Sequence, residues 1–434
     1  MSRPLGRRSF LALAGAASAA ALAGCGGSIR PGGVQGQAAA FDTEYDGPPV
    51  QLDFWNPFTG GDGPTMLALV EDFQRAHPAV RVRTTSLLAD DLYAKVLPAV
   101  ASGSGPHVVV MHLDQLPTYA LRGTVLPVDE AVAAAGLTEA DYVPGAWQQA
   151  EYRGLRWGLP LDVFAVGQYW STEAFGAAGL TGPVPGDRFD EAVAALQAAG
   201  TAHPFSVAPN NWQLWVGLLA QHGGALFDEA GERATFASDA GVEALAWMRS
   251  LVESGASADG VADAWALFKA GASVWTSNLP AGIPNLQDTA PDLAWQLAPF
   301  PQVGPRPGVF ANSHHLGLTA LSQAEDGTAQ AAATFVTWLS RHSAGWARAG
   351  NVPAFAGARA EVADAPQAVL ATDDALASYS FLPLLPSSRD IAANSYQRAV
   401  SQAVLGQASP RDALVFAQRT AQQQLDQLND LYGI

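Results

Sequence analysis

The stretch VQLDFWNPFTGGDGPTM, residues 50–66, decides the fold of this chain. Apolar residues alternate with polar ones from Val50 to Phe54, which predicts a strand, and a glycine-rich turn follows Trp55. A helix is expected to begin near residues 62–64, where Asp62 can cap it and a proline suits its first turn. Its buried face is marked by apolar residues at helical spacing: Met66, Leu69, Val70 and Phe73.

The alternation of predicted strands and helices continues along the chain. The segment HPAVRVRTT (residues 77–85) predicts a second strand, and DDLYAKVLPAVASG (90–103) predicts a second helix that is interrupted or ends near Pro98. The apolar run in PHVVVM (106–111) is typical of a strand that is covered on both faces. The resulting β-α-β-α-β order predicts an α/β lobe with parallel strands.

Ligands of such open sheets bind outside the carboxyl ends of the strands, which here are residues 55–62 and 111–114. The turn after Trp55 does not match a phosphate-binding loop, and no Lys or Arg occurs between Phe41 and Arg75. Because the carboxylate of Asp62 repels anions, we expect a neutral ligand that bears hydroxyl groups, such as a sugar. Trp55 would offer a flat apolar face, while Thr59 and Asp62 would accept hydrogen bonds. The simpler alternative is that Trp55 belongs to the core and Asp62 only caps the helix.

The N-terminus predicts export and lipid attachment. Residues 1–24 combine three arginines with a short apolar core, which is typical of a signal peptide, and GRRSFLALAG resembles a twin-arginine signal. LAGC, residues 22–25, resembles a bacterial lipobox, in which Cys25 would carry the lipid. Cys25 is also the only cysteine, so no disulfide framework or cysteine-based zinc site is expected. Residues 25–47 lack apolar periodicity and are predicted to be a flexible tether.

Charge and motifs exclude several classes of function. The formal net charge of −17 argues against binding to nucleic acid and against direct binding to anionic lipid. Neither metal-binding histidine spacing nor the serine-nucleophile motif of hydrolases is present, and no cofactor or metal is implied. A glycosidase needs only two positioned carboxylates, so a lipid-anchored carbohydrate-active hydrolase stays open as an alternative.

The opening stretch and its continuation to residue 130 resemble the N-terminal lobe of family 1 extracellular solute-binding proteins, the carbohydrate-binding lipoproteins of bacterial ABC importers. Further segments carry the resemblance over nearly all of residues 48–434: YRGLRWGLPLDVFAVGQYW (152–170), ALFKAGASVWTSNLP (266–280), FPQVGPRPGVFANSHHLGLTA (300–320) and FVTWLSRHSAGWARAGNVPAF (335–355). Where relatives have a Tyr and then a Tyr-Asn pair, this chain has Trp157 and Trp170-Ser171.

The resemblance implies an α/β, two-lobe periplasmic-binding-protein fold, similar to maltose-binding protein, with a hinge and a helical C-terminus. The N-terminal lobe would comprise residues 48–160 and 316–346, and the C-terminal lobe residues 161–315 and 347–434. The chain would cross between the lobes near residues 160–165, near 312–315 and after Trp346.

By family position, ligand-binding side chains are expected in both lobes. The full set of candidate ligand contacts is Trp55, Phe58, Thr59, Asp62, His112, Asp114, Asp162, Asn211, Trp212, Trp275, Asn278, Ser313, His314 and Arg389. Only one of the adjacent His314 and His315 can reach the cleft, because neighbouring strand residues face opposite ways. Arg389 or Arg156, if directed inward, would permit a glycerophosphate-type ligand. Four other tryptophans are assigned to the core: Trp215, Trp247, Trp338 and Trp346.

The function implied is capture of a mono-, di- or short oligosaccharide between the lobes and its delivery to membrane permeases. The protein would be held by its lipid on the outer face of the cell membrane. Glycerophosphate binding by the same fold, and a sensory rather than a transport role, remain alternatives.

Overall fold

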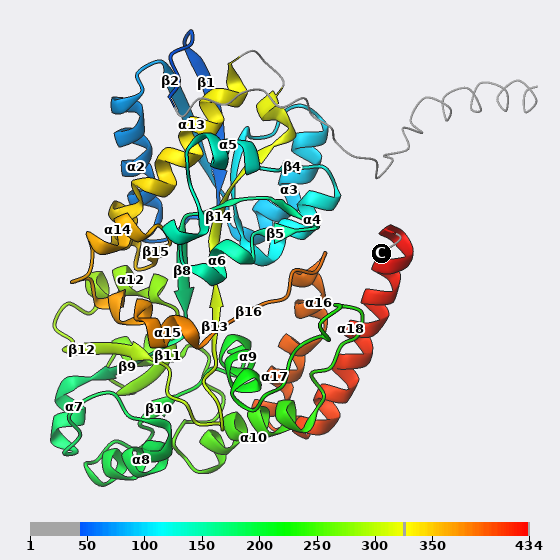
Figure 1. The fold of residues 1–434 in the computed structure, drawn as a ribbon. Helices are drawn as coiled ribbons and strands as arrows, with labels where there is room; N and C mark the ends of the chain where they lie inside the picture. The colour runs from blue at the N-terminus through cyan, green and yellow to red at the C-terminus, as the bar shows by residue number, and fades with distance from the viewer. Residues whose placement is uncertain (1–43, 324–326, 433–434) are drawn as a thin grey trace, which may run out of the picture. The chain divides into compact units, whose positions relative to one another are not determined.

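A computed structural model describes residues 44–323 and 327–432 (Figure 1). The predicted signal peptide, most of the predicted tether and the lipidation site Cys25 lie outside the described residues. None of the helices in the described ranges is long and apolar enough to cross a membrane.

A six-stranded sheet, here called the first sheet, is built mainly from the N-terminal part of the chain. Its strands run in the order β2-β1-β3-β14-β4, and β7 also pairs with β14. Strands β2 and β3 both run parallel to β1, which confirms the predicted β-α-β-α-β unit. The bounds are β1 Val50–Asn56, β2 Val80–Ser86, β3 Val108–His112, β4 Val125–Leu126, β7 Leu159–Pro160 and β14 His314–Thr319.

Helices cover both faces of the first sheet, as the alternation of side chains on β3 requires. Val108 and Val110 pack toward α2 and α13, whereas Val109 and Met111 pack toward α3 and α4. The apolar face of α2 is buried as its spacing predicts, at Met66, Leu69, Val70 and Phe73. The helices are α2 Gly63–Ala76, α3 Ala89–Ala101, α4 Leu116–Leu121, α5 Asp129–Ala134, α6 Pro144–Gln148 and α13 Thr328–Arg341 (Figure 1).

Helix α3 ends close to Pro98, as the sequence predicts. It continues to Ala101 with the proline inside its last turn. The ring removes one N–H donor there, but the Pro98 carbonyl still accepts from the backbone N–H of Ser102 (3.0 Å).

A second sheet has the strand order β10-β11-β9-β12. Strand β11 runs parallel to β10 and antiparallel to β9, so the carboxyl ends of β10 and β11 lie at one edge. The strands are β9 Gly167–Ser171, β10 Phe205–Ser206, β11 Trp275–Asn278 and β12 Trp295–Pro299. The helices between them are α7 Thr172–Ala177, α8 Phe189–Ala198, α9 Trp212–Gln221, α10 Asp239–Glu253, α11 Ala264–Lys269 and α12 Ile283–Thr289.

A third sheet, of order β15-β8-β13-β16, contains strands that continue directly from the other two. The chain passes from β7 in the first sheet to β8 after Pro160, and from β13 back into β14 after Asn312. These are the places where crossings were expected. The strands are β8 Asp162–Ala165, β13 Val309–Asn312, β15 Val352–Pro353 and β16 Tyr379–Phe381, and a 3₁₀ segment η6, Ser343–Ala349, precedes β15.

The C-terminus is helical, as predicted, and its last three helices pack against α9 and α10 in one large core. Its helices are α14 Ala356–Ala360, α15 Asp373–Ala377, α16 Ser388–Asn394, α17 Tyr396–Val404 and α18 Pro410–Tyr432 (Figure 1). A short hairpin of β5 Glu151–Tyr152 and β6 Leu155–Arg156 turns through Arg153 (φ 55°) and Gly154 (φ 75°).

Candidate ligand-binding site

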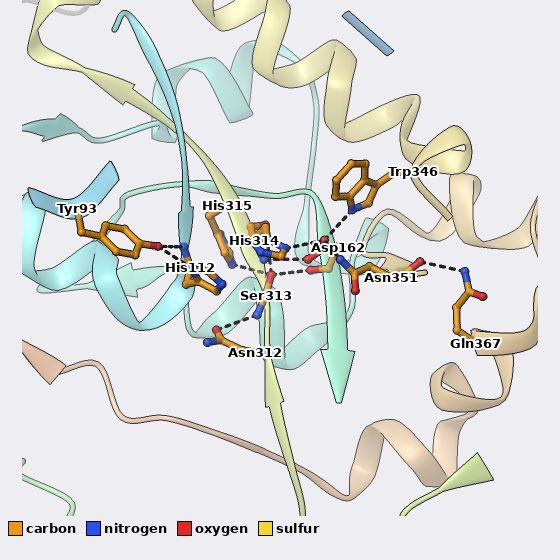
Figure 2. A network of polar contacts seen from close by, with 10 residues as sticks. All are labelled: Tyr93, His112, Asp162, Asn312, Ser313, His314, His315, Trp346, Asn351 and Gln367. Carbon is orange, nitrogen blue, oxygen red and sulfur yellow. Dashed lines mark hydrogen bonds and ion pairs between the residues drawn. The ribbon is translucent and has the colours of Figure 1, made fainter. Parts of the chain in front are cut away.

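A buried carboxylate, Asp162, sits where the crossing strands meet (Figure 2). Its Oδ1 accepts from the backbone N–H of His314 (2.8 Å). Its Oδ2 accepts from His314 Nδ1 (2.8 Å), Trp346 Nε1 (2.7 Å) and Asn351 Nδ2 (3.1 Å). The hydroxyl of Ser313 donates to the Asp162 backbone carbonyl (2.6 Å). Asp162 and Ser313 were predicted to touch ligand, but both are fully buried and their polar atoms already have protein partners, so we assign them to holding the crossing together.

Two histidines face each other beside this carboxylate, with ring centroids 4.6 Å apart. The Tyr93 oxygen accepts from the backbone N–H of His112 (2.9 Å) and lies 2.7 Å from His112 Nδ1. The tyrosine proton is therefore available to Nδ1, and we assign the proton of neutral His112 to Nε2. His314 donates from Nδ1 to Asp162, so its Nε2 is an acceptor in the neutral ring.

Burial controls the charge of this region. Burial and then the neighbouring imidazole of His314 lower the pKa of His112, so His112 is neutral at neutral pH. Burial raises the pKa of Asp162, but the charge and hydrogen bonds of His314 and the indole of Trp346 outweigh it, and the net pKa lies below its ordinary value. Asp62 is half-buried, and burial raises the pKa of its carboxyl.

The carboxylate of Asp114 is also fully engaged. Its Oδ1 accepts from Asn312 Nδ2 (2.9 Å), and its Oδ2 accepts from Gln115 Nε2 (2.6 Å). Ser388, at the start of α16, donates its hydroxyl proton to the Asp114 backbone carbonyl (2.7 Å). Asp114 thus joins η1 (Leu113–Gln115), β13 and α16, and little of it is left for a ligand.

A cavity of about 470 Å³, here called the main pocket, lies at the carboxyl edge of the second sheet. Three predicted residues line it: Asn211, Trp212 and Asn278. They meet because β10 and β11 are parallel, so the loop after β10 reaches the end of β11; Asn211 Nδ2 donates to Ser277 Oγ (3.1 Å). The Asn211 side-chain oxygen accepts from the Leu214 N–H (3.1 Å), which caps α9 and places Trp212 at its first position.

Sequence reasoning missed several residues of the main pocket, above all Trp265. Its ring stacks on Phe268 (5.7 Å between centroids) and packs edge-on against Tyr169 (4.9 Å). The capping carboxylate of Asp263 fixes the start of α11 by accepting from the Ala266 N–H (2.9 Å), which turns Trp265 toward the pocket wall. The sequence signal that could have predicted Trp265 as a pocket residue is the helix-capping Asp263 two positions before it. The remaining polar lining residues are Asn210, Gln213 and Ser277.

Of the other candidates in the N-terminal region, Phe58 and Asp62 lie near His314. Phe58 is buried and packs its ring against His314 (5.0 Å) and Trp346 (4.5 Å). Asp62 accepts from the Gly60 N–H (3.0 Å) rather than capping α2, and Thr59 is exposed. Trp55 is half-buried against the cluster that covers α3, so one part of its ring remains accessible.

Two further candidates do not line the main pocket. Trp275 has no exposed surface; it begins β11 rather than ending it, packs against Phe189 (4.3 Å) and donates from Nε1 to Gln168 (3.2 Å). Its expected stacking on a ligand is therefore not retained, because its ring is part of the core. Arg389 is half-buried, donates from Nε to Asp90 (3.0 Å) and lies over the ring of Tyr93 (5.3 Å to the centroid), whose oxygen contacts His112.

The described residues contain no cluster of three or more His, Cys, Asp or Glu side chains that could hold a metal ion.

The family of this chain follows from comparison with known proteins. The family model described as bacterial extracellular solute-binding protein matches residues 59–346, about two-thirds of the sequence. The chain belongs to this family, whose members are binding proteins without catalytic activity. No curated protein sequence matches the chain significantly.

Solved structures show the same fold. The GacH receptor of Streptomyces glaucescens, solved unliganded and with acarbose, is 21% identical with a TM-score of 0.76, covering 88% of this chain and 99% of that one. The sugar-binding protein MalE of Xanthomonas citri is 19% identical with a TM-score of 0.76 and the same coverage. UgpB of Mycobacterium tuberculosis, in complex with glycerophosphocholine, is 21% identical with a TM-score of 0.74, again covering 88% and 99%. The predicted α/β fold of the maltose-binding type is thereby confirmed.

Proposed function

We propose that this protein is the sugar-binding subunit of an ABC importer and that it captures a neutral saccharide in the main pocket. The observation that carries the proposal is the lining of that pocket. It combines amide and hydroxyl side chains with the indoles of Trp212 and Trp265 and contains no Lys or Arg. Its volume of about 470 Å³ falls in the range of small-molecule sites.

This lining matches the chemistry of a sugar. Amide side chains both donate and accept hydrogen bonds, as hydroxyl groups require, and an indole face covers the C–H surface of a ring. Asn278 uses its oxygen to accept from the Leu279 N–H (2.8 Å), which leaves its amide N–H groups for a ligand. Trp212 is held edge-on against Phe310 (5.2 Å), so its orientation is fixed before binding.

The histidine pair supplies the opposite wall in this proposal. Phe164 packs against His314 (5.0 Å), and Val166, two residues further along the same extended segment, lines the main pocket. A ligand hydroxyl could accept from His112 Nε2–H and donate to His314 Nε2, because the assigned tautomers are complementary. Together with Asp62 and the accessible part of Trp55, these residues would form the N-terminal side of the site.

Capture would involve closure of two lobes about the third sheet. We take the lobes as residues 48–160 with 316–346 and residues 161–315 with 347–434. Closure is a hinge motion in which a few junction residues absorb the change in backbone angles, and ligand favours the closed population. Asp162 lies at the junction, where it binds His314 and the segment between Trp346 and Asn351.

A glycerophosphate-type ligand is the second candidate, since UgpB, with the same fold, was solved with glycerophosphocholine. The two cations considered for it are engaged elsewhere. Arg389 pairs with Asp90, and Arg156 is buried over the Trp147 ring (3.7 Å to the centroid) and donates to the Trp147 carbonyl. A neutral sugar unit is therefore favoured in the main pocket.

Export and anchoring belong to the same proposal. The signal peptide of residues 1–24 would direct export, and acylated Cys25 would hold the protein at the outer face of the membrane beside its permeases.

The test is calorimetric titration of the purified protein with neutral mono-, di- and trisaccharides and with glycerophosphocholine. We expect saturable binding of a saccharide, and a loss of about 1–3 kcal/mol of binding free energy in Trp212→Ala. Asn278→Ala should also weaken binding, whereas Asn285→Ala, the same change at an exposed site outside the pocket, should not. Binding of glycerophosphocholine alone, or unchanged affinity in both pocket variants, would contradict the proposal.

A further inference from the structure

A second cavity of about 390 Å³, here called the outer pocket, shares a wall with the main pocket. Asn210 and Trp212 line both cavities. The other side of the outer pocket is one face of α17, with Gln397, Arg398 and Ser401. Trp212 is held against α17 through Tyr396, whose ring centroid lies 5.8 Å away, so the indole is a fixed partition between the two cavities.

The two cavities differ in charge. The main pocket contains a carboxylate, Asp263, and no cation, whereas Arg398 is the only charged residue lining the outer pocket. This contrast stands out in a chain with 40 acidic and 23 basic residues. Among the described residues no ion pair involves Arg398, and the same holds for exposed Arg419, whereas Arg188 pairs with Glu191 and Arg411 with Asp239.

Neighbouring groups also favour an anion there. Gln397 and Arg398 lie in the first turn of α17, where the helix dipole stabilises negative charge. The guanidinium offers parallel N–H donors that match the two oxygens of a carboxylate, and the amides of Gln397 and Gln402 can donate to adjoining hydroxyls.

We propose that the ligand is an acidic oligosaccharide: a neutral sugar occupies the main pocket, and a neighbouring uronic acid unit crosses the Trp212 partition and places its carboxylate on Arg398. This inference rests on the proposed function, since it names the class of saccharide that the same site takes. It explains why one indole is exposed to two cavities, because successive sugar rings can stack on its two sides.

The probes are an aldobiouronic acid, which is a disaccharide of one neutral sugar and one uronic acid, and its carboxyl-reduced neutral counterpart. We expect the wild-type protein to bind the acidic probe about threefold to fivefold more tightly, because an ion pair at an exposed side chain such as Arg398 has a modest effect. Arg398→Gln should abolish this preference and leave binding of the neutral probe unchanged. Arg419→Gln, an equal change of charge at an exposed position outside both pockets, should keep the preference.

The outcomes separate this inference from the proposed function. Equal binding of both probes, or a preference that survives in Arg398→Gln, overturns the acidic-ligand inference while neutral saccharide binding stands. Tighter binding of a sugar phosphate than of the uronic acid overturns the carboxylate assignment. If neither probe nor any other saccharide binds, both the inference and the proposed function fail.

Discussion

Replacing Asp162 with Asn tests the central structural claim, that one buried carboxylate joins β8 to the segments that carry His314, Trp346 and Asn351. Four donors converge on its two oxygens, three of them on Oδ2. An asparagine keeps one acceptor. If its oxygen takes the Oδ2 position, its NH₂ group faces the backbone N–H of His314, donor against donor, and if it takes the Oδ1 position, three donors lose their partner.

The expected cost follows from this geometry. The better arrangement loses one buried hydrogen bond, leaves a buried N–H unsatisfied and replaces charge-assisted bonds with neutral ones. Each unsatisfied group costs about 1–3 kcal/mol, and a hydrogen bond to a charged group is worth about 1.5–3 kcal/mol, more than a neutral one. We therefore expect Asp162→Asn to lower the free energy of unfolding by about 3 kcal/mol, measured by urea denaturation at neutral pH.

Asp90→Asn is the matched control, because it removes a carboxylate from the ion pair with Arg389. The Asp90 side chain is 86% exposed, so its loss should cost at most about 1 kcal/mol. If Asp162→Asn folds too poorly to measure, Trp346→Phe removes one donor and part of a fully buried ring, and should cost about 2–4 kcal/mol. Asp162→Asn within 1 kcal/mol of wild type, or no more costly than Asp90→Asn, would refute the reasoning.

Three further predictions concern acid, a close contact and the N-terminus. The pKa of Asp162 is lowered in the folded state, so its stabilising effect is complete above about pH 4 and is lost as pH falls through the folded pKa. The difference in the free energy of unfolding between the wild type and Asp162→Asn, measured by denaturation at a series of pH values, should therefore disappear in acid and persist at alkaline pH. Gly282→Ala should weaken saccharide binding measured by calorimetry, because the added Cβ would lie 2.9 Å from Asn278 Nδ2 and 3.0 Å from the Trp265 ring. Gly176→Ala is the control: its Cβ would meet no atom within 4 Å, so saccharide binding should not change. Cys25→Ser should move the protein from the membrane to the soluble fraction on cell fractionation, and continued membrane association would contradict lipid attachment there.

Much of the first sheet could be predicted because its signals are local. The alternation in β1, the helical spacing in α2 and the apolar run of β3 each follow from residues close together in sequence, and the structure has all three elements. Helix α3 ends three residues beyond Pro98, because a proline in the last turn removes only one hydrogen bond.

The site was harder to predict because local sequence patterns show neither where a strand begins and which end reaches a pocket, nor which distant residues a side chain contacts. Trp275 and Asn278 lie on one strand, but only the carboxyl end of β11 reaches the pocket, and the sequence did not show that the strand begins at the tryptophan. Asp162 was expected at a crossing and Asp114 just after the third strand, but the hydrogen-bond partners of both carboxylates come from distant segments, which no local pattern shows.

The wide sequence separation of the groups around Asp162 also bears on how the chain folds. His314, Trp346 and Asn351 follow that carboxylate by 152, 184 and 189 residues, so these contacts form only after long loops have closed. A nascent polypeptide that ends before Asn351 would contain the aspartate without its full set of donors. The contacts around Asp162 therefore form late in the synthesis and folding of the chain. Truncated chains that end before Asn351 should be more sensitive to proteases than the full-length protein.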